Sequence, residues 1–357
     1  MNMLRYMQPF YTDHTPKVLL TGNGLHRAFE DANWDKLLRD LSGSRFSDEK
    51  WGILKKLPYP QLAIVATGNH LNTGMKEASQ LYIQSDVLPG EDTLIKKAIN
   101  TGFEAILTTN YSYEIEKALC PGFHVAIGKA SKYRKKTCKD KPKAETTALY
   151  NYLLVPNENS ETIIWHIHGE AAIPDSMIIG HYYYGRLLSR IQTYTAETIK
   201  RYKIAERNGD LFYPRSWVDY ILFGNVYIVG QGMDQSEMDL WWLMDCKKLY
   251  GKGTAVLYKP DMPQEQVMLA EACGVTPETC EMPLSFVEYY EGIFSKLTST
   301  LGGEAFDVET ELEKEDYDAA VEAIRELNIE SGKSFAEGYQ GGSETTLLYD
   351  PIVKAYI

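Results

Sequence analysis

The sequence predicts an α/β fold: a Rossmann-like parallel sheet with helices on both faces and large helical insertions. Two observations indicate this fold. Short runs that are apolar at consecutive positions, such as VLL after Lys17, alternate with longer stretches of helical periodicity. A strand that is apolar on both faces is typical of a parallel sheet covered by helices on each side. In addition, these runs end in glycine or short polar residues, which turn a strand into a ligand-binding loop.

The predicted strands and helices alternate along the chain. The first strand ends in a Gly-x-Gly turn, and a helical pattern starts at Trp34 with apolar residues at i, i+3, i+4 and i+7. Residues 45–100 and 185–220, approximately, carry helical signals and are predicted to be helical insertions. The strands are expected at residues 17–25, 103–110, 162–169, 225–232 and 254–260.

Three further segments complete the predicted organisation. Residues 121–161 look loop-rich, and the basic run at 131–143 is interpreted as a solvated loop because it contains one tyrosine and a proline rather than interleaved aromatic residues. The stretch MDQSEMDLWWLM predicts an amphipathic helix after the fourth strand. We therefore expect one large domain with helical insertions over residues 1–300 and an acidic C-terminal helix and tail over 301–357.

Composition argues against several classes of protein. The net charge of -12 does not favour binding to nucleic acid or to an anionic membrane. The five cysteines are scattered and never spaced as C-x-x-C, which argues against a structural zinc site and a disulfide framework. No apolar run reaches the roughly 18 residues of a membrane-spanning helix. The N-terminus also lacks the apolar segment of a signal peptide, so the sequence indicates a cytoplasmic protein without a membrane partner.

The ends of the predicted strands carry the candidate binding residues, because ligands bind at the carboxyl ends of strands in an open parallel sheet. Glycines after a strand let backbone N–H groups approach a phosphate, although Arg27 stands where G-x-G-x-x-G has its third glycine. Asn110 ends a Thr-Thr-Asn sequence whose hydroxyls and carboxamide can orient a ribose or a water, or it simply caps the next helix. The four strand ends are Gly22–Gly24, Thr108–Asn110, His166–Gly169 and Gly230–Gly232.

The stretch ETIIWHIHGE places His166 and His168 two residues apart at a strand end, so both are expected on one face of the strand. Three interpretations are open: a metal pair, a catalytic base with a neighbour, or two ordinary polar residues. No other histidine stands in a recognisable pair with an acidic residue at a strand end, so no metal is expected. His168, followed by Gly169, lies where the chain opens toward a ligand, and His166 is expected deeper in the sheet.

Four motifs, in order, carry a family resemblance: VLLTGNGL, ILTTNYSYEIE, WHIHGE and YIVGQGMDQSEMDLWWLM. Together they resemble the sirtuin-like NAD-consuming family, and more closely the sirtuin-like effectors of bacterial anti-phage defence, which hydrolyse NAD. The resemblance covers about residues 17–260. It implies that Asn110 and His168 are the catalytic pair, with His166 as support. It also implies NAD as substrate, no metal, a homo-oligomer and a partner protein from a defence system.

The same resemblance implies which residues bind NAD. Ser112 stands where the family has an aspartate that helps to hold the nicotinamide carboxamide, and Glu114 is a candidate substitute. Two further departures are His26 at a serine position of the first motif and Gly232 at the Ser/Thr position of the last. The implied NAD-binding residues are Gly22, Asn23, Gly24, Leu25, Thr109, Tyr111, Ser112, Gly230, Gln231 and Gly232.

The cysteine spacing separates this chain from the protein-deacetylating members of the family, which carry a four-cysteine zinc module. The resemblance therefore implies hydrolysis of NAD rather than deacetylation. Two alternatives stay open: a non-catalytic sensor that binds NAD or ADP-ribose, and a metal-dependent hydrolase that uses His166 and His168.

An aromatic cluster follows the histidine motif in IIGHYYYGRLL. Three consecutive tyrosines, Tyr182 to Tyr184, cannot all face one way on a strand or a helix. Gly180 and Gly185 flank them as candidate hinges. The sequence predicts a lid or wall over the NAD pocket with His181 or one of these tyrosines near the ligand, and the alternative is an aromatic core patch.

Overall fold

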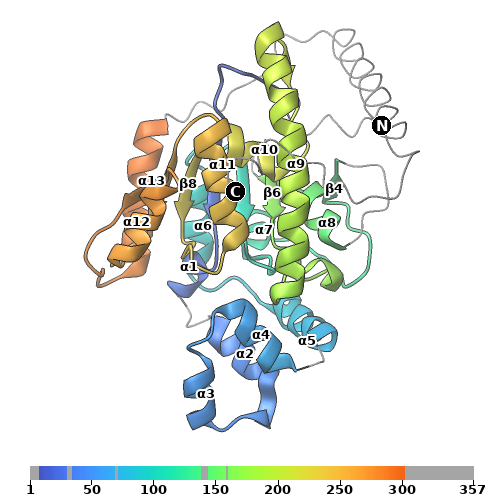
Figure 1. The fold of residues 1–357 in the computed structure, drawn as a ribbon. Helices are drawn as coiled ribbons and strands as arrows, with labels where there is room; N and C mark the ends of the chain where they lie inside the picture. Colours follow the sequence, from blue (N-terminus) through green and yellow to red (C-terminus); the bar gives the residue numbers. More distant parts are fainter. Residues whose placement is uncertain (1–7, 30–33, 69–70, 138–143, 158–159, 302–357) are drawn as a thin grey trace, which may run out of the picture. The chain divides into compact units, whose positions relative to one another are not determined.

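The computed structural model describes residues 8–29, 34–68, 71–137, 144–157 and 160–301. An eight-stranded sheet lies at the centre of this part of the chain, in the order β10-β9-β8-β2-β3-β6-β5-β4 (Figure 1). Six neighbouring strands are parallel: β10 (Thr276–Glu278), β9 (Ala255–Tyr258), β8 (Asn225–Val229), β2 (Lys17–Thr21), β3 (Ala105–Thr108) and β6 (Ser160–His166). The predicted Rossmann-like α/β fold is confirmed, because all five expected strands belong to this sheet.

The sheet departs from the prediction at one edge, where β5 (Asn151–Asn157) pairs antiparallel with both β6 and β4 (Arg134–Lys136). The expectation that residues 121–161 are loop-rich is therefore wrong for β4, β5 and the intervening helix α8 (Ala144–Tyr150). The short apolar run YLLV in β5 is buried, but Pro156 and polar residues at both ends of the strand weaken its signal in the sequence. Residues 138–143 of the basic run lie outside the described part.

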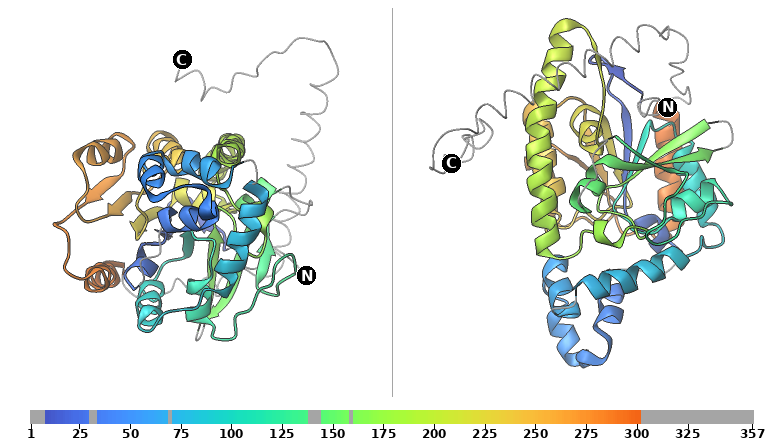
Figure 2. Two further views of the ribbon diagram at one scale, coloured as in Figure 1. Left: turned by 90° about the horizontal axis from the view of Figure 1, so that it is seen from below. Right: turned by 90° about the vertical axis from the view of Figure 1, so that its right-hand side faces the viewer.

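Helices cover the sheet on both faces, as Figure 2 shows from two further sides. One layer contains α1 (Gly24–Arg27), α6 (Glu91–Ile99), α7 (Glu114–Leu119) and α13 (Phe286–Leu301), which contact one another through α6. The other contains α8, α9 (His181–Asn208), α10 (Trp217–Phe223) and α11 (Met238–Tyr250). Helix α12 (Gln264–Ala272) connects β9 to β10, and the short pair β1 (Phe10–Tyr11) and β7 (Leu211–Phe212) stands apart from the main sheet.

The apolar strands bury side chains on both faces. Leu19 and Ile106 belong to the apolar cluster that includes residues of α6, α7 and α13. Their neighbours Leu20 and Leu107 point the other way and are also fully buried. Burial on both faces explains why these strands read as continuous apolar runs.

The first predicted insertion is helical, as expected. It consists of α2 (Trp34–Ser42), the 3₁₀ turn η2 (Gly43–Arg45), α3 (Asp48–Leu54), α4 (Tyr59–Thr67) and α5 (Leu71–Gln84). Helices α2, α4 and α5 pack on one another, α4 contacts α9, and α5 contacts the 3₁₀ turn η3 (Pro174–Ser176). The second insertion comprises most of α9, then β7 and the start of α10. Within the described residues, no helix is both long and apolar enough to cross a membrane. The acidic helix and tail expected over 301–357 fall, apart from Leu301, outside the described residues.

Candidate active site

The predicted site residues follow four strands that lie side by side in the sheet: β8, β2, β3 and β6. Thr108 of β3 is paired in register with His166 of β6. Asn110 and His168 each follow two residues later, so they leave the sheet at equivalent positions of neighbouring strands. The structure therefore brings the predicted catalytic pair to one place at the carboxyl edge.

The backbone of Asn110 is held on both sides, whereas its carboxamide is not. Its N–H donates to the Oγ1 of Thr108 at 3.1 Å, and its carbonyl oxygen accepts from the Nδ1 of His166 at 2.6 Å. The side chain is partly exposed and makes no hydrogen bond to any described residue. Asn110 does not cap α7, whose N-cap is Tyr113. The carboxamide is therefore available to a ligand.

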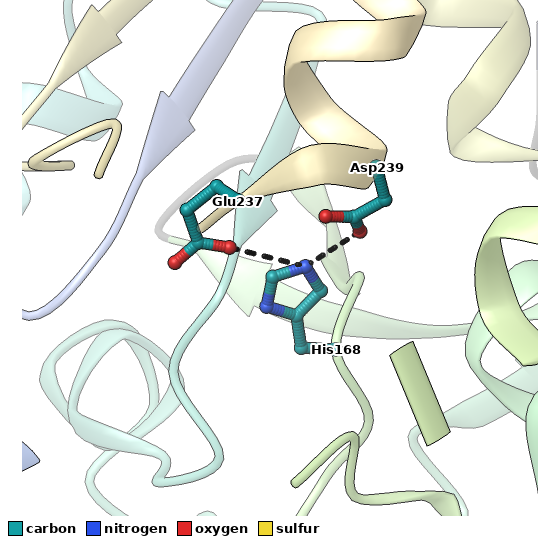
Figure 3. A group of neighbouring side chains, drawn as sticks. All are labelled: His168, Glu237 and Asp239. Atoms are coloured by element: carbon teal, nitrogen blue, oxygen red, sulfur yellow. Dashed lines mark hydrogen bonds and ion pairs between the residues drawn. The ribbon is translucent and has the colours of Figure 1, made fainter. Parts of the chain in front are cut away.

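His168 is buried beside two carboxylates (Figure 3). Its Nε2 lies 2.9 Å from the Oδ2 of Asp239 and 3.9 Å from the Oε2 of Glu237. The ring of Tyr184 meets the imidazole edge-on, with ring centroids 5.4 Å apart. Burial by itself lowers the pKa of His168, but the hydrogen bond and charge of Asp239, with a smaller contribution from Glu237, raise it above its ordinary value.

Glu237 and Asp239 were not predicted as site residues. Burial raises the pKa of Glu237 to about 7, and the hydroxyl of Tyr184 donates to its carboxylate at 3.5 Å. The Oδ1 of Asp239 is buried and has no hydrogen-bond partner in the part of the chain that the structure describes. Ligand atoms of His168, Glu237 and Asp239 lie within 4.8 Å of one another, so this group has the composition of a metal site. Acidic residues soon after the glycine-rich end of β8 are visible in the sequence, but nothing there indicates that two of them contact His168.

His166 contacts different groups from His168. The Nε2 of His166 lies 2.8 Å from the Oε1 of Glu116 in α7, and its Nδ1 is bonded to Asn110. Burial opposes the charged imidazole, but Glu116 outweighs this effect and raises the pKa of His166 to about 9.

The expectation that the two histidines share one face is wrong. Strand β6 ends at His166, and a turn closed by the N–H of Gly169 on the carbonyl of His166, at 2.9 Å, carries His168 toward α11 in the other helix layer. His166 lies under Asn110 rather than under His168. Because both of its ring nitrogens are engaged, the proposed metal pair of His166 and His168 is not formed either.

The glycine turns after β2 and β8 pack directly on each other. The N–H of Gly24 donates to the carbonyl oxygen of Gly230 at 2.7 Å, and a Cβ at Gly24 would lie 2.5 Å from that oxygen. The amide of Gln231 donates to Thr109 Oγ1 at 3.3 Å, and a Cβ at Gly22 would lie 2.9 Å from the same hydroxyl. These predicted binding residues are therefore neighbours. Close backbone approach requires glycine at Gly24, whereas a Cβ at Gly22 would meet the side chains of Thr109 and Gln231.

Gly232 and four more of the predicted NAD-binding residues lie within the turns and helices of the protein and have contacts there. Gly232 donates its N–H to the Oε1 of Gln231 at 2.7 Å. Asn23 precedes the short helix α1 as its N-cap residue, and Leu25 is buried within that helix. The hydroxyl of Tyr111 donates to the carbonyl of Ile178 at 2.8 Å. Ser112 donates to the Oε2 of Glu114 at 2.6 Å, so the serine and its candidate substitute act on each other.

A cavity of about 730 Å³ opens next to Asp239, the hydrogen-bond partner of His168, and its volume is within the range of small-molecule sites. Neither Asn110 nor His168 is among its lining residues. Its walls come from residues 55–58 after α3, the first residues of α4, the start of α9, residues 234–236 before α11, and residues 238 and 239 at the start of α11. Tyr184 and His181, two of the predicted lid residues, line it together with Asp239. Tyr182 is 63% exposed and does not line the cavity, and Gly185 lies inside α9, which contradicts its expected role as a hinge.

One family model matches part of the chain. Residues 104–272 match the model of the SIR2-like domain, a span that contains both catalytic candidates and both carboxylates beside His168. This match confirms the sirtuin-like resemblance. A crystal structure of a Sir2 homolog in complex with NAD aligns with 80% of this chain and 91% of its own, at 9% identity and a TM-score of 0.32. No curated protein matches the chain.

Proposed function

We propose that this chain, whose residues 104–272 match a SIR2-like domain, hydrolyses NAD by breaking the bond between nicotinamide and ribose. One observation carries the proposal. Asn110, with an unengaged carboxamide, and His168, a buried imidazole, leave the sheet at equivalent positions of paired strands. A cavity of about 730 Å³, within the range of small-molecule sites, is lined by Asp239, the hydrogen-bond partner of His168.

The reaction needs a positioned water and a proton acceptor. As the bond between the ribose C1′ and the nicotinamide nitrogen breaks, its electron pair leaves with nicotinamide, which becomes neutral, and the ribose acquires oxocarbenium character. Asn110 orients the ribose hydroxyls and the water by hydrogen bonds. The water oxygen bonds to C1′, and its proton passes to His168, a suitable base once its imidazole is neutral. The products are nicotinamide and ADP-ribose.

The glycine turns after β2 and β8 are proposed to bind the part of the dinucleotide beyond the nicotinamide ribose. Gly22, Gly24 and Gly230 lie in turns that follow the adjacent strands β2 and β8, and among the described residues nothing lies within 4 Å of a Cβ built at the neighbouring Gly232. The proposal assigns the pyrophosphate and the adenosine ribose to these turns. Ser112 and Glu114 are assigned to the nicotinamide carboxamide.

The proposal extends to the biological setting implied by the resemblance. The chain acts as an NAD-depleting effector of bacterial anti-phage defence, as a cytoplasmic homo-oligomer with a partner protein from the defence system. The runner-up function is a sensor that binds NAD or ADP-ribose without cleaving it. The hydroxyl of Ser112, which stands at the family's aspartate position and is engaged by Glu114 at 2.6 Å, favours this second candidate.

Incubation of the purified chain with NAD separates the two functions. A hydrolase releases nicotinamide and ADP-ribose in equal amounts, and His168→Ala loses the release while it keeps the wild-type circular dichroism spectrum. A sensor binds NAD in calorimetry and returns it unchanged. Release of nicotinamide by His168→Ala at the wild-type rate would remove His168 from the reaction.

A further inference from the structure

We infer that Asp239 is the positioning residue for His168: its carboxylate accepts the Nε2–H of the imidazole and so leaves Nδ1 as the atom that receives the proton. The role of Nδ1 as proton acceptor rests on the proposed function, whereas the position of the imidazole hydrogen on Nε2 does not. The distance between Nε2 and Oδ2 is 2.9 Å, and both side chains are almost completely buried, at 2% and 0% exposure.

The chemistry of the pair determines which nitrogen carries the proton. An ionised carboxylate only accepts hydrogen bonds, so a neutral imidazole bonded to it through Nε2 must carry its hydrogen there. Glu237, at 3.9 Å from the same nitrogen, is beyond hydrogen-bond distance and does not compete for it. Nδ1 has no hydrogen-bond partner among the described residues, so its lone pair is available.

The surroundings hold this arrangement in place. Asp239 lies in the first turn of α11, where a carboxylate is stabilised by the helix dipole. Leu240 and Leu243 of the same helix are fully buried, which fixes the helix against the sheet. From α9, the ring of Tyr184 packs on the imidazole edge-on at 5.4 Å and restricts its rotation. The titratable groups that face His168 are therefore Asp239 and Glu237 from α11 and Tyr184 from α9.

A bound cation is the competing explanation for the same geometry, because Asp239 has a second, unpartnered oxygen and Glu237 is close by. Figure 3 shows that oxygen of Asp239 turned toward the side on which Glu237 lies. The direct hydrogen bond between His168 and Asp239 favours the proton over an ion between the same two atoms.

Long-range ¹H–¹⁵N spectra of histidine-labelled protein report the tautomer without reference to activity. The His168 signals are assigned by their loss in His168→Ala, at a pH where this imidazole is neutral. The wild type is expected to show one tautomer, with the proton on Nε2 and slow exchange with water. In Asp239→Asn we expect faster exchange of that proton, a lower pKa for His168, and a kcat roughly 10- to 100-fold lower with a KM close to the wild-type value.

Glu237→Gln is the matched control, because it removes one carboxylate from the same end of α11 without touching the hydrogen bond. It should keep the protected Nε2–H and lower the pKa of His168 less than Asp239→Asn does. A wild-type spectrum with the proton on Nδ1, or equal effects of the two variants, overturns the inference. Treatment with EDTA should change neither the spectrum nor the rate. If EDTA abolishes the protected Nε2–H signal and the activity, and Mn²⁺ restores both, a bound ion and not Asp239 determines the state of His168. If the tautomer is as expected but NAD is not cleaved, the proposed function fails and the positioning role stands.

Discussion

The Nδ1 of His166 lies 2.6 Å from the backbone carbonyl oxygen of Asn110, and the same ring is bonded through Nε2 to Glu116 at 2.8 Å. A single buried imidazole thus connects the loop after β3 to helix α7. Both nitrogens act as donors when the ring is charged, which is the state that Glu116 favours. His166 is therefore a structural residue that fixes the backbone at Asn110.

The stability of the fold should consequently depend on pH through His166. The pKa of this group is about 9 in the folded protein and about 6.5 in the unfolded chain, so its stabilising contribution is fully present below about pH 6.5. The contribution is lost as the pH rises through 9. The shift corresponds to a loss on the order of 3 kcal/mol in the free energy of unfolding. Urea unfolding of the wild type between pH 6 and roughly 10 measures it.

The His166→Gln variant is the reference for that measurement. It removes the titrating group, so the difference in unfolding free energy between wild type and variant should shrink as the pH rises. His168 and His14, whose pKa values are also raised, titrate in both proteins and cancel in the difference. A difference that stays constant from pH 6 to roughly 10 would contradict a charged His166.

Gly169→Ala should be strongly destabilising. Gly169 has a φ of +90°, and a Cβ there would lie 2.0 Å from the carbonyl oxygen of Ser176. The turn that carries His168 away from β6 must then move, at a cost of several kcal/mol or failure to fold. Gly185→Ala is the control, since a Cβ at that position of α9 meets nothing within 4 Å and alanine is the better helix former. Thermal unfolding of both variants checks the prediction, and an equal, small effect of the two would contradict it.

The predictions from sequence alone succeeded where one local pattern was sufficient. Continuous apolar runs that end in glycine or short polar residues located the strands. Their order in the sheet, which places Asn110 next to His168, was not predicted from the sequence. The contact between His168 and Asp239 joins residues 71 positions apart, and an aspartate in a first helical turn is ordinary, so nothing in the sequence distinguished it. The sequence also did not indicate which way the side chain of His168 points. Side chains alternate with period 2 only within a strand, and β6 ends at His166.

Ser112→Ala should weaken NAD binding modestly if Ser112 and Glu114 hold the nicotinamide carboxamide. One hydrogen bond contributes about 1 kcal/mol, which corresponds to a roughly fivefold higher Kd. The hydroxyl donates to Glu114 at 2.6 Å, and burial raises the pKa of that carboxyl, so Glu114→Gln tests the same contact from the other side. Calorimetric titration of a cleavage-deficient His168→Ala background with NAD gives both affinities. Unchanged affinity in both variants would place nicotinamide recognition elsewhere.

The start of α9 should contact the bound dinucleotide. Tyr184 packs on His168 and lines the cavity together with His181. The hydroxyl of Tyr182 instead accepts a hydrogen bond from the Nη1 of Arg186 at 3.0 Å. A structure of His168→Ala with NAD should place the ring of Tyr184 or His181 within about 7 Å of the ligand. Tyr184→Phe, which keeps the ring and removes the hydroxyl, should retain NAD binding, and Tyr184→Ala should weaken it. If both rings lie farther away than that limit, they form a core patch and not a wall of the site.

The rate of nicotinamide release from NAD, measured for the wild type beside Asn110→Ala and His168→Ala under one condition, tests the central claim most directly. Both substitutions truncate side chains beyond the ends of β3 and β6, so native circular dichroism spectra and cooperative thermal unfolding are expected in each. We expect equal amounts of nicotinamide and ADP-ribose from the wild type and a rate at least about 100-fold lower in each variant. Turnover within about tenfold of the wild type in either folded variant would contradict the assignment of the catalytic pair.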